Sequence, residues 1–165
     1  RYVAGAADAG LVFLEQPFRD NDLNTTLALA RVSPVPLCAD ESAHSLEHIM
    51  QWQHAGAIGG VNPNTTKLAG TAATLPAPLV SDAIGLAIVL ASKIAESSIG
   101  TAGLVHLGYC VPNLDWGINP TSHYLAEDLV REALKPVGGS SPRPTGPGLG
   151  IDVDEGAVAR FRAKL

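Results

Sequence analysis

The sequence predicts an α/β domain built on a parallel sheet, and three features of the chain lead to that class. Short apolar runs rich in β-branched residues alternate with stretches whose apolar residues recur at helical spacing. Strands that alternate with helices form right-handed βαβ units, which place the strands in parallel. The run over residues 86–91 is apolar without a break, as expected of a strand covered on both faces.

The first two strand–helix units are the clearest. Residues 11–16 and 35–40 are apolar runs of strand length, and each ends at or near an acid. A helix over residues 22–32, capped near residues 20–21, follows the first run. A helix over residues 45–55 follows the second, and its apolar residues form one face: Leu46, Ile49, Met50 and Trp52.

The later elements continue this alternation. A third strand over residues 58–64 is followed by a stretch over residues 68–84 that we expect to be helical. The strand over residues 86–91 is followed by a helix over residues 99–107, and residues 114–118 form a weaker fifth strand. We therefore expect five parallel strands.

The two ends of the chain differ from this pattern. The chain opens at Arg1 within an expected helix over residues 1–10, so we expect it to be a piece of a longer protein. From about residue 136 proline, glycine and serine dominate, and a short polar helix over residues 154–164 closes the chain. The sequence thus predicts a barrel-type domain over residues 1–135 and an irregular tail over residues 136–165.

Composition and charge narrow the class and the partners. Apolar residues make up 46% of the 165 residues and charged residues 16%, which suits a folded domain with a core. The formal net charge is −5 without a run of basic residues, so neither a nucleic acid nor a membrane surface is an expected partner. Cys38 and Cys110 lie beside apolar residues, and we expect them to be reduced core residues of a cytoplasmic protein.

Glu15 and Asp40 are the candidate metal ligands. They are 25 residues apart, one strand–helix unit, so each is expected at the carboxyl end of its strand. Five such strands form either a small doubly wound sheet or about half of an eight-stranded barrel, and acids at this edge favour the barrel. Two neighbouring carboxylates repel each other unless a cation lies between them, and oxygen ligands favour Mg²⁺ or Mn²⁺. In the alternative, each acid only ends a strand or pairs with an arginine such as Arg19.

Four motifs occur along the chain: Phe13-Leu-Glu-Gln-Pro17, Cys38-Ala-Asp-Glu-Ser42, Glu96-Ser-Ser-Ile-Gly100 and Gly146-Pro-Gly-Leu-Gly150. Their order and spacing resemble those of the enolase superfamily, muconate-lactonizing subgroup. The chain resembles this family over nearly its whole length. The resemblance implies the C-terminal part, about five βα units, of a modified (β/α)7β barrel that is incomplete as given. Members are often dimers or octamers, so a homo-oligomer is within the expectation.

The resemblance also implies roles for the two acids. Glu15 and Asp40 would be the second and third Mg²⁺ ligands, with the first ligand and a pair of lysine bases placed before Arg1. The family's reaction is abstraction of the proton α to a carboxylate, here of a small amino or imino acid. The ion stabilises the negative charge that develops on the substrate.

The motif departs from the family at Asn64. A catalytic lysine is implied there, 24 residues after Asp40, and an amide cannot act as a general base although it can donate a hydrogen bond. Lys67 is the candidate replacement, but we rather expect it to begin the next helix and to face solvent or anions. Pro63 is expected to remove a ladder N–H from a central strand, and two prolines in residues 74–78 to interrupt a helix.

Lys93, Glu96 and Asp115 are the candidate substrate-binding residues. The first two follow the fourth strand, and the resemblance implies that this segment lines the pocket. Asp115 is expected to end the last strand, where an acid pairs with a substrate ammonium in some branches. In the alternatives, Glu96 is an acid at a helix N-terminus and Asp115 belongs to a turn. Residues 95–102 and 113–117 are most similar to the hydroxyproline-dehydratase branch.

The sequence therefore predicts Mg²⁺-dependent dehydration of a hydroxyproline-like imino acid, a lyase reaction. The alternative is a racemase or epimerase of amino acids or dipeptides, but racemisation needs bases on both faces and the amide at Asn64 weighs against it. A different class also stays open: an inactive or partial homologue that binds a cation weakly. These 165 residues alone are not expected to turn over a substrate.

Overall fold

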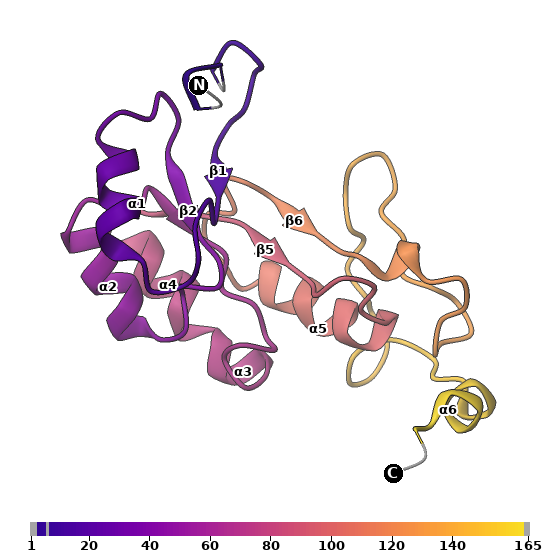
Figure 1. The fold of residues 1–165 in the computed structure, drawn as a ribbon. Helices are drawn as coiled ribbons and strands as arrows, with labels where there is room; N and C mark the ends of the chain where they lie inside the picture. Colours follow the sequence, from indigo (N-terminus) through magenta and orange to yellow (C-terminus); the bar gives the residue numbers. More distant parts are fainter. Residues whose placement is uncertain (1–2, 6, 164–165) are drawn as a thin grey trace.

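The strands and helices follow one another along the chain in the predicted order (Figure 1). The computed structural model describes residues 3–5 and 7–163. The strands are β1 (Leu14–Glu15), β2 (Leu37–Ala39), β3 (Gly60–Val61), β4 (Ala87–Ile88), β5 (Leu90–Ala91) and β6 (Ile118–Asn119). The helices are α1 (Leu23–Ala30), α2 (Leu46–His54), α3 (Thr71–Thr74), α4 (Pro76–Ala83), α5 (Ser98–Gly108) and α6 (Glu155–Phe161), with short 3₁₀ turns η1 (Val3–Gly5) and η2 (Ser122–Tyr124).

The strand pairs are parallel, as predicted. One sheet has the order β1-β2-β3-β4, and β5 pairs with β6. The run over residues 86–91 is two strands rather than one, because the chain changes partner within it. Val89 N donates to Val61 O at 3.1 Å, whereas Leu90 N donates to Gly117 O at 3.1 Å. The two sheets are thus joined through one continuous segment and form an arc.

The helix starts agree with local capping chemistry. Asp22 caps α1 by accepting from Thr25 N at 3.1 Å, one residue beyond the predicted cap. Ser45 caps α2 by accepting from His48 N at 3.2 Å. The predicted helix over residues 1–10 is wrong in the described part, where only η1 forms, and Arg1, Tyr2 and Ala6 lie outside the described residues.

The prolines in residues 74–78 interrupt the predicted helix, whereas Pro63 does not interrupt the strand ladder. The stretch over residues 68–84 forms two short helices, and Pro76 is the first residue of α4, where its missing N–H would have had no partner. Pro78 lies in the same first turn. Pro63 lies beyond the end of β3, whose last ladder bond runs from Asn62 N to Ala39 O at 2.8 Å. The predicted loss of a ladder bond is therefore wrong.

The core lies on one face of the arc. Helices α1, α2 and α4 pack on the face that carries Ala39 and Val61, and α5 packs against Ile88 and Leu90. Val61 pairs with Ile88, so both helix layers cover the same face. A doubly wound sheet has helices on both faces, whereas a barrel has them on the outside. The arrangement is therefore that of a barrel arc, with its inner face left to other side chains.

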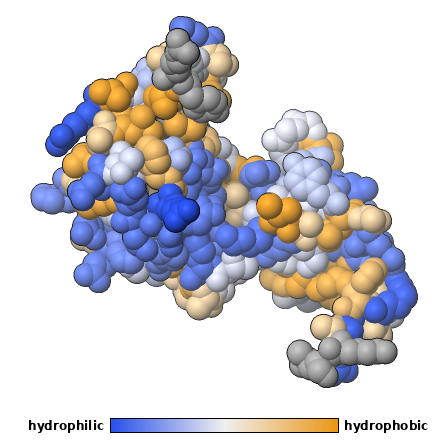
Figure 2. Space-filling model, in the orientation of Figure 1, coloured by the Kyte–Doolittle hydropathy of each residue, from blue (hydrophilic) through white to orange (hydrophobic). Residues whose placement is uncertain are grey.

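The C-terminal tail folds back on the segment before it. Val130 and Val153 form an antiparallel bridge, and Asp154 N donates to Leu129 O at 2.9 Å. The predicted boundary between residues 135 and 136 stays a prediction, and these bonds cross it. Figure 2 shows a largely hydrophilic centre on this side of the molecule, with apolar side chains gathered below the N-terminal segment and around the C-terminal loops.

Both cysteines are free. Cys38 is buried as predicted, but Cys110 is exposed, so its placement in the core is wrong. Among residues 3–5 and 7–163, every helix is too short or too polar to cross a membrane.

Candidate active site

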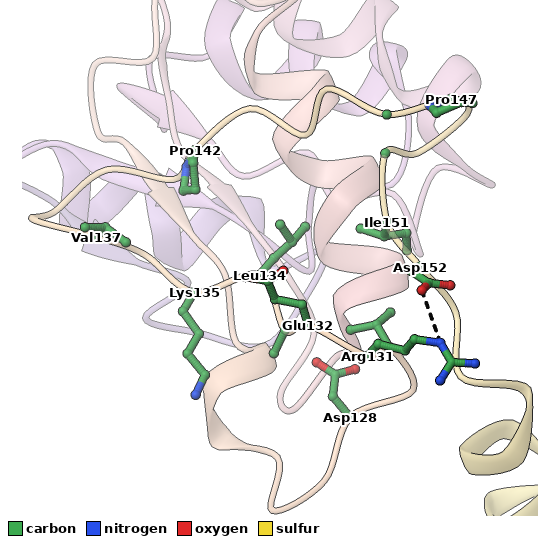
Figure 3. A pocket seen from close by; sticks show the side chains of 14 residues that line it. Asp128, Arg131, Glu132, Leu134, Lys135, Val137, Pro142, Pro147, Ile151 and Asp152 are labelled. Atoms are coloured by element: carbon green, nitrogen blue, oxygen red, sulfur yellow. Dashed lines mark ion pairs between the residues drawn. The ribbon is translucent and has the colours of Figure 1, made fainter.

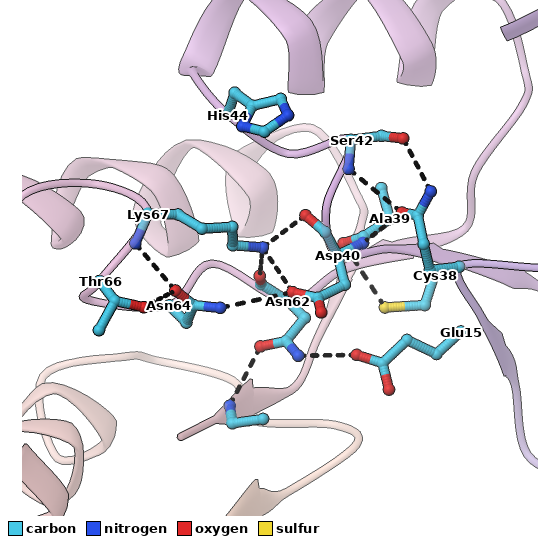
Figure 4. A network of polar contacts seen from close by, with 12 residues as sticks. Glu15, Cys38, Ala39, Asp40, Ser42, His44, Asn62, Asn64, Thr66 and Lys67 are labelled. Carbon is cyan, nitrogen blue, oxygen red and sulfur yellow. Dashed lines mark hydrogen bonds and ion pairs between the residues drawn. The ribbon is translucent and has the colours of Figure 1, made fainter. Parts of the chain in front are cut away.

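Polar side chains from three neighbouring strands gather at the carboxyl ends of those strands (Figure 4). Glu15 is the last residue of β1, and Asp40 comes directly after β2. Asn62 and Asn64 follow β3. Since β1, β2 and β3 are adjacent and parallel, their ends meet at one edge of the arc. The sequence prediction that Glu15 and Asp40 end neighbouring strands is confirmed.

Lys67 reaches into this cluster. Its Nζ donates to Asp40 Oδ1 at 2.5 Å, to Asn62 O at 2.8 Å and to Asp40 O. The side chains of Lys67 and Asp40 are only 8% and 17% exposed. The expectation that Lys67 begins a helix and faces solvent is therefore wrong. Residues 65–69 form a turn, in which Ala69 has a φ of 64°, and this turn directs the lysine back over the strand ends.

Asn64 holds that turn together. Its Oδ1 accepts from Thr66 Oγ1 at 2.8 Å and from Lys67 N at 3.0 Å. Its Nδ2 lies 3.5 Å from Asp40 Oδ1, a long hydrogen bond. Asn64 is 3% exposed. The Asn64 amide thus stabilises the turn over residues 65–69, at the position where the resemblance implies a base.

Asn62 connects Glu15 with the neighbouring sheet. Its Nδ2 donates to Glu15 Oε1 at 2.7 Å, and its Oδ1 accepts from Ala91 N in β5 at 3.1 Å. Asn62 is 2% exposed, whereas Glu15 is exposed. The sequence analysis missed Asn62. The signal was present, because residues two apart after a strand point to the same face, and Asn62 and Asn64 are so spaced.

Gln16 joins the ends of β1 and β2 and was also missed. Its Oε1 accepts from Asp40 N at 2.9 Å and from Ser42 N at 3.2 Å. Its Nε2 donates to Ser42 Oγ at 2.9 Å and to Phe18 O at 3.0 Å. Three of the four polar contacts of this amide therefore hold the segment of Asp40 and Ser42, and the fourth lies within the segment of Gln16 itself.

Burial is the main cause of a shifted pKa at two groups in the cluster. Burial, together with the negative charges of Glu15 and Asp40, raises the pKa of the Cys38 thiol well above its usual value. A neutral thiol is a poor metal ligand and a poor nucleophile, so Cys38 packs rather than reacts. Burial also lowers the pKa of Lys67, although its hydrogen bond and ion pair with Asp40 act in the opposite direction.

Lys93 and Glu96 lie after β5, at the same edge of the arc as the cluster. Lys93 is exposed, and its charge is near enough to contribute to the lowered pKa of Lys67, after burial as the main cause. Glu96 Oε2 accepts from Lys93 N at 3.2 Å, so the acid closes the loop between them. Glu96 also directly precedes Ser97, the N-cap of α5, and its carboxylate lies against Gly100 in the first turn, which agrees with the alternative of an acid at a helix N-terminus. Asp128 accepts from Ser98 N at the same end of the helix.

Asp115 lies away from the cluster. The predicted strand over residues 114–118 is wrong, because β6 begins at Ile118 and Asp115 precedes it. Asp115 is exposed and lines a hollow of about 530 Å³ with residues that precede other strands: Pro36, Gly59 and Leu86. Asp115 is thus at the amino ends of the strands, and the expectation that it ends a strand beside the substrate is wrong.

A larger hollow lies elsewhere in the described part of the chain. It measures about 960 Å³ and is formed by the tail and the loop before it (Figure 3). Its charged lining includes Asp128, Arg131 and Asp152, of which the last two form an exposed ion pair at 3.1 Å. It contains none of the predicted site residues.

The donor chemistry of the cluster suits a divalent cation that prefers oxygen. Glu15 and Asp40 offer carboxylate oxygens from adjacent strand ends, which are ligands that Mg²⁺ and Mn²⁺ accept. Among the described residues no group of three or more His, Cys, Asp or Glu side chains converges on one point. The two carboxylates therefore fit as part of a ligand set, and Lys67 already contacts one of them.

Comparison with known proteins identifies the family. Residues 1–157 match the family model described as enolase C-terminal domain-like. The chain belongs to this family. The barrel-arc architecture and the resemblance to the enolase superfamily are thereby confirmed, whereas the hydroxyproline-dehydratase branch stays a prediction.

The relatives of this enolase-family chain include several cycloisomerases. It is 31% identical over 159 residues to muconate cycloisomerase 1 of Rhodococcus opacus, covering 96% of this chain and 42% of the relative. It is 29% identical over 145 residues to N-succinylamino acid racemase of Thermus thermophilus, covering 86% and 38%. The crystal structure of 2-chloromuconate cycloisomerase from Rhodococcus opacus 1CP matches with a TM-score of 0.88 at 28% identity, covering 96% of this chain and 43% of that one. The chain thus spans about two fifths of the length of these relatives.

Proposed function

We propose that Glu15 and Asp40 hold a Mg²⁺ or Mn²⁺ ion as part of a larger ligand set, in a protein that transfers the proton α to a carboxylate. The position of the two carboxylates at the carboxyl ends of adjacent parallel strands carries the proposal. Amides fix both residues: Asn62, which follows β3, donates to the Glu15 carboxylate, and Gln16, which follows β1, accepts from the backbone N–H of Asp40. The chemistry that such an ion supplies is stabilisation of the negative charge that develops on a small carboxylate substrate.

Asn64 supports reactions that need a single proton-transferring group. Racemisation requires groups on both faces of the carbon, and an amide at this position cannot take a proton. Lys67 is a weak substitute, because its three N–H bonds are all donated to protein oxygens. Cycloisomerisation and elimination each need one proton transfer at the carbon. We therefore place the protein with cycloisomerases or dehydratases rather than racemases.

Fewer observations support the choice of substrate than support the metal site. Dehydration of a hydroxyproline-like imino acid is our specific candidate for an elimination, supported by the resemblance of residues 95–102. Its other support was Asp115 as the partner of the substrate ammonium, and Asp115 lies at the amino ends of the strands. Lys93 is the better-placed contact for a substrate, since it is exposed at the carboxyl edge near Lys67. A lysine suits a second carboxylate, which muconate-type diacids carry.

The test is proton exchange at the substrate carbon in the full-length protein that carries this chain. With candidate diacids and imino acids in D₂O and Mg²⁺, NMR should show incorporation of deuterium or product without racemisation. Asp40→Asn and Glu15→Gln should each abolish it. Asn64→Lys should add racemisation of an amino-acid substrate that the unmodified protein does not racemise. Exchange that persists in both carboxylate variants would remove the metal site from the mechanism.

The other class, an inactive homologue that binds a cation weakly, makes the opposite prediction in the same experiment. No candidate acid would exchange its α-proton with the metal present, although Mn²⁺ would still bind. A homo-oligomer and a cytoplasmic location stay predictions, and the latter agrees with two free cysteines.

A further inference from the structure

We infer that Lys67 is a built-in cation of this site that competes with the divalent ion for Asp40. The inference deepens the proposed function and rests on it, because it concerns the affinity and regulation of the same carboxylates. It assigns Lys67 the role of setting how much metal the site binds, instead of the role of a replacement base.

The three acceptors around Lys67 identify its chemical state. Two are backbone carbonyls, Asp40 O and Asn62 O, and the third is the carboxylate oxygen Asp40 Oδ1. Carbonyl oxygens and the oxygens of an ionised carboxylate only accept hydrogen bonds, so with Asp40 ionised the lysine must supply three N–H donors. Only the protonated ammonium has three. Lys67 therefore presents a full positive charge directly to Asp40.

The lysine is also held in place by its surroundings. Its side chain is 8% exposed, and its own backbone N–H is fixed by Asn64 Oδ1 at 3.0 Å. Two backbone bonds close the turn around it, from Leu68 N to Asn64 O at 3.3 Å and from Gly70 N to Thr65 O at 2.7 Å. A surface lysine leaves a carboxylate at little cost, whereas this one must give up three hydrogen bonds and a packed position.

The competition follows from the shared oxygen. A Mg²⁺ ligand oxygen lies about 2.1 Å from the ion, and Asp40 Oδ1 already has Lys67 Nζ at 2.5 Å. An ion on that oxygen would lie within a few ångströms of a like charge in a poorly solvated place, where repulsion is strong. The ion must therefore displace the lysine or bind Asp40 through its other oxygen with reduced affinity. Lys67 keeps Asp40 neutralised and resists metals that bind weakly.

The experiment is a Mn²⁺ titration of the 165-residue chain, followed by calorimetry and by the loss of the free Mn²⁺ signal in electron paramagnetic resonance. Lys67→Met should bind Mn²⁺ at least about tenfold more tightly than the unmodified chain, since a neighbouring positive charge is removed. Lys135→Met is the matched control, because Lys135 is exposed and its replacement by methionine changes the net charge by the same amount. That control should stay within about twofold, as expected of a screened surface charge. Asp40→Asn should abolish binding in either background.

Each outcome of the titration either supports or overturns the competition between Lys67 and the metal ion. Tighter binding in Lys67→Met with an unchanged Lys135→Met supports the competition. If the unmodified chain binds Mn²⁺ and Lys67→Met binds no more tightly, the competition is overturned while the metal site of the proposed function stands. If neither the unmodified chain nor Lys67→Met binds Mn²⁺, the competition is overturned. If the full-length protein does not bind Mn²⁺ either, the metal site of the proposed function is overturned as well. Should Lys67→Met fail to fold, Lys67→Gln keeps a polar side chain without the charge and is judged by the same affinities.

Discussion

Replacing Asn62 by alanine should destabilise the arc, because one buried amide serves two strands. Asn62 Nδ2 donates to Glu15 at 2.7 Å, and a hydrogen bond to a charged group contributes about 1.5–3 kcal/mol. Asn62 Oδ1 accepts from Ala91 N at 3.1 Å, and an unsatisfied buried N–H costs about 1–3 kcal/mol. Glu15 is exposed and regains water, so the lower end applies to that bond. We expect a loss of about 2.5–4.5 kcal/mol in the free energy of unfolding.

The assay is urea unfolding at pH 7, followed by circular dichroism. Asn113→Ala is the matched control, because the Asn113 amide also donates to a carboxylate, Asp82, at 2.6 Å, but at an exposed place. That change should cost less than about 0.5 kcal/mol, as surface substitutions usually do. Asn62→Asp adds a second test, since it keeps an acceptor for Ala91 N but sets a like charge against Glu15. It should therefore destabilise more at pH 7 than near pH 4.

Equal losses for Asn62→Ala and Asn113→Ala would refute the reasoning. Burial would then not increase the contribution of the Asn62 hydrogen bonds to the free energy of unfolding. The link between Glu15 and β5 would stabilise the fold no more than an exposed hydrogen bond does. A large loss in both variants would point the same way, because the exposed bond would be as strong as the buried one.

Two further predictions concern packing and capping. Gly60→Ala should cost about 2–4 kcal/mol in urea unfolding, because the new Cβ would lie 2.2 Å from the Trp116 ring and 2.6 Å from Ala87 O. Gly108→Ala, whose Cβ would find only ordinary contacts at 3.7–3.8 Å, should be neutral, and equal losses in the two alanine variants would contradict the steric argument. The pKa of Asp154 is lowered from 3.8, chiefly by the hydrogen bond from Ala157 N, so its cap on α6 is complete above pH 3.8 and is lost as the pH falls through the lowered value. Hydrogen exchange of the Ala157 amide should therefore quicken, relative to the intrinsic rate, only at the acid end, and Asp154→Asn should remove that dependence.

The elements that the sequence predicted are those fixed by local chemistry. The helices α1, α2 and α5 follow apolar spacing, and α1 and α2 start at capping side chains. Such signals lie within one turn of the chain. The strands β1 and β2 were predicted for the same reason, because each is a short apolar run that ends at or next to an acid. Glu15 and Asp40 could be placed together because parallel strands end at a common edge.

The errors arise where the position depends on contacts between distant residues. The run over residues 86–91 has uniform composition, and only its two partners, β3 and β6, divide it into two strands. Asp115 was placed at the end of a strand because residues 114–118 were predicted as that strand and the resemblance implies an acid at its end, yet β6 begins at Ile118. A shift of a few residues there moves a side chain from the carboxyl edge to the amino edge of a short-stranded arc.

The Lys67 error has a different cause, which lies in the side chain of Asn64. Sequence spacing read residues 65–69 as the start of a helix, whereas the Asn64 side chain stabilises a turn by accepting from Lys67 N at 3.0 Å. The residue that removes a base from position 64 is therefore also the one that brings the lysine at position 67 to Asp40. A lysine at position 64 would lose this cap and would add a second positive charge beside Asp40 Oδ1, from which Asn64 Nδ2 is 3.5 Å away. Asn64→Lys thus changes two things at once, the supply of a base and the position of Lys67. Its effect on racemisation can be assigned to the base only if Mn²⁺ affinity, measured in the same variant, shows what became of Lys67.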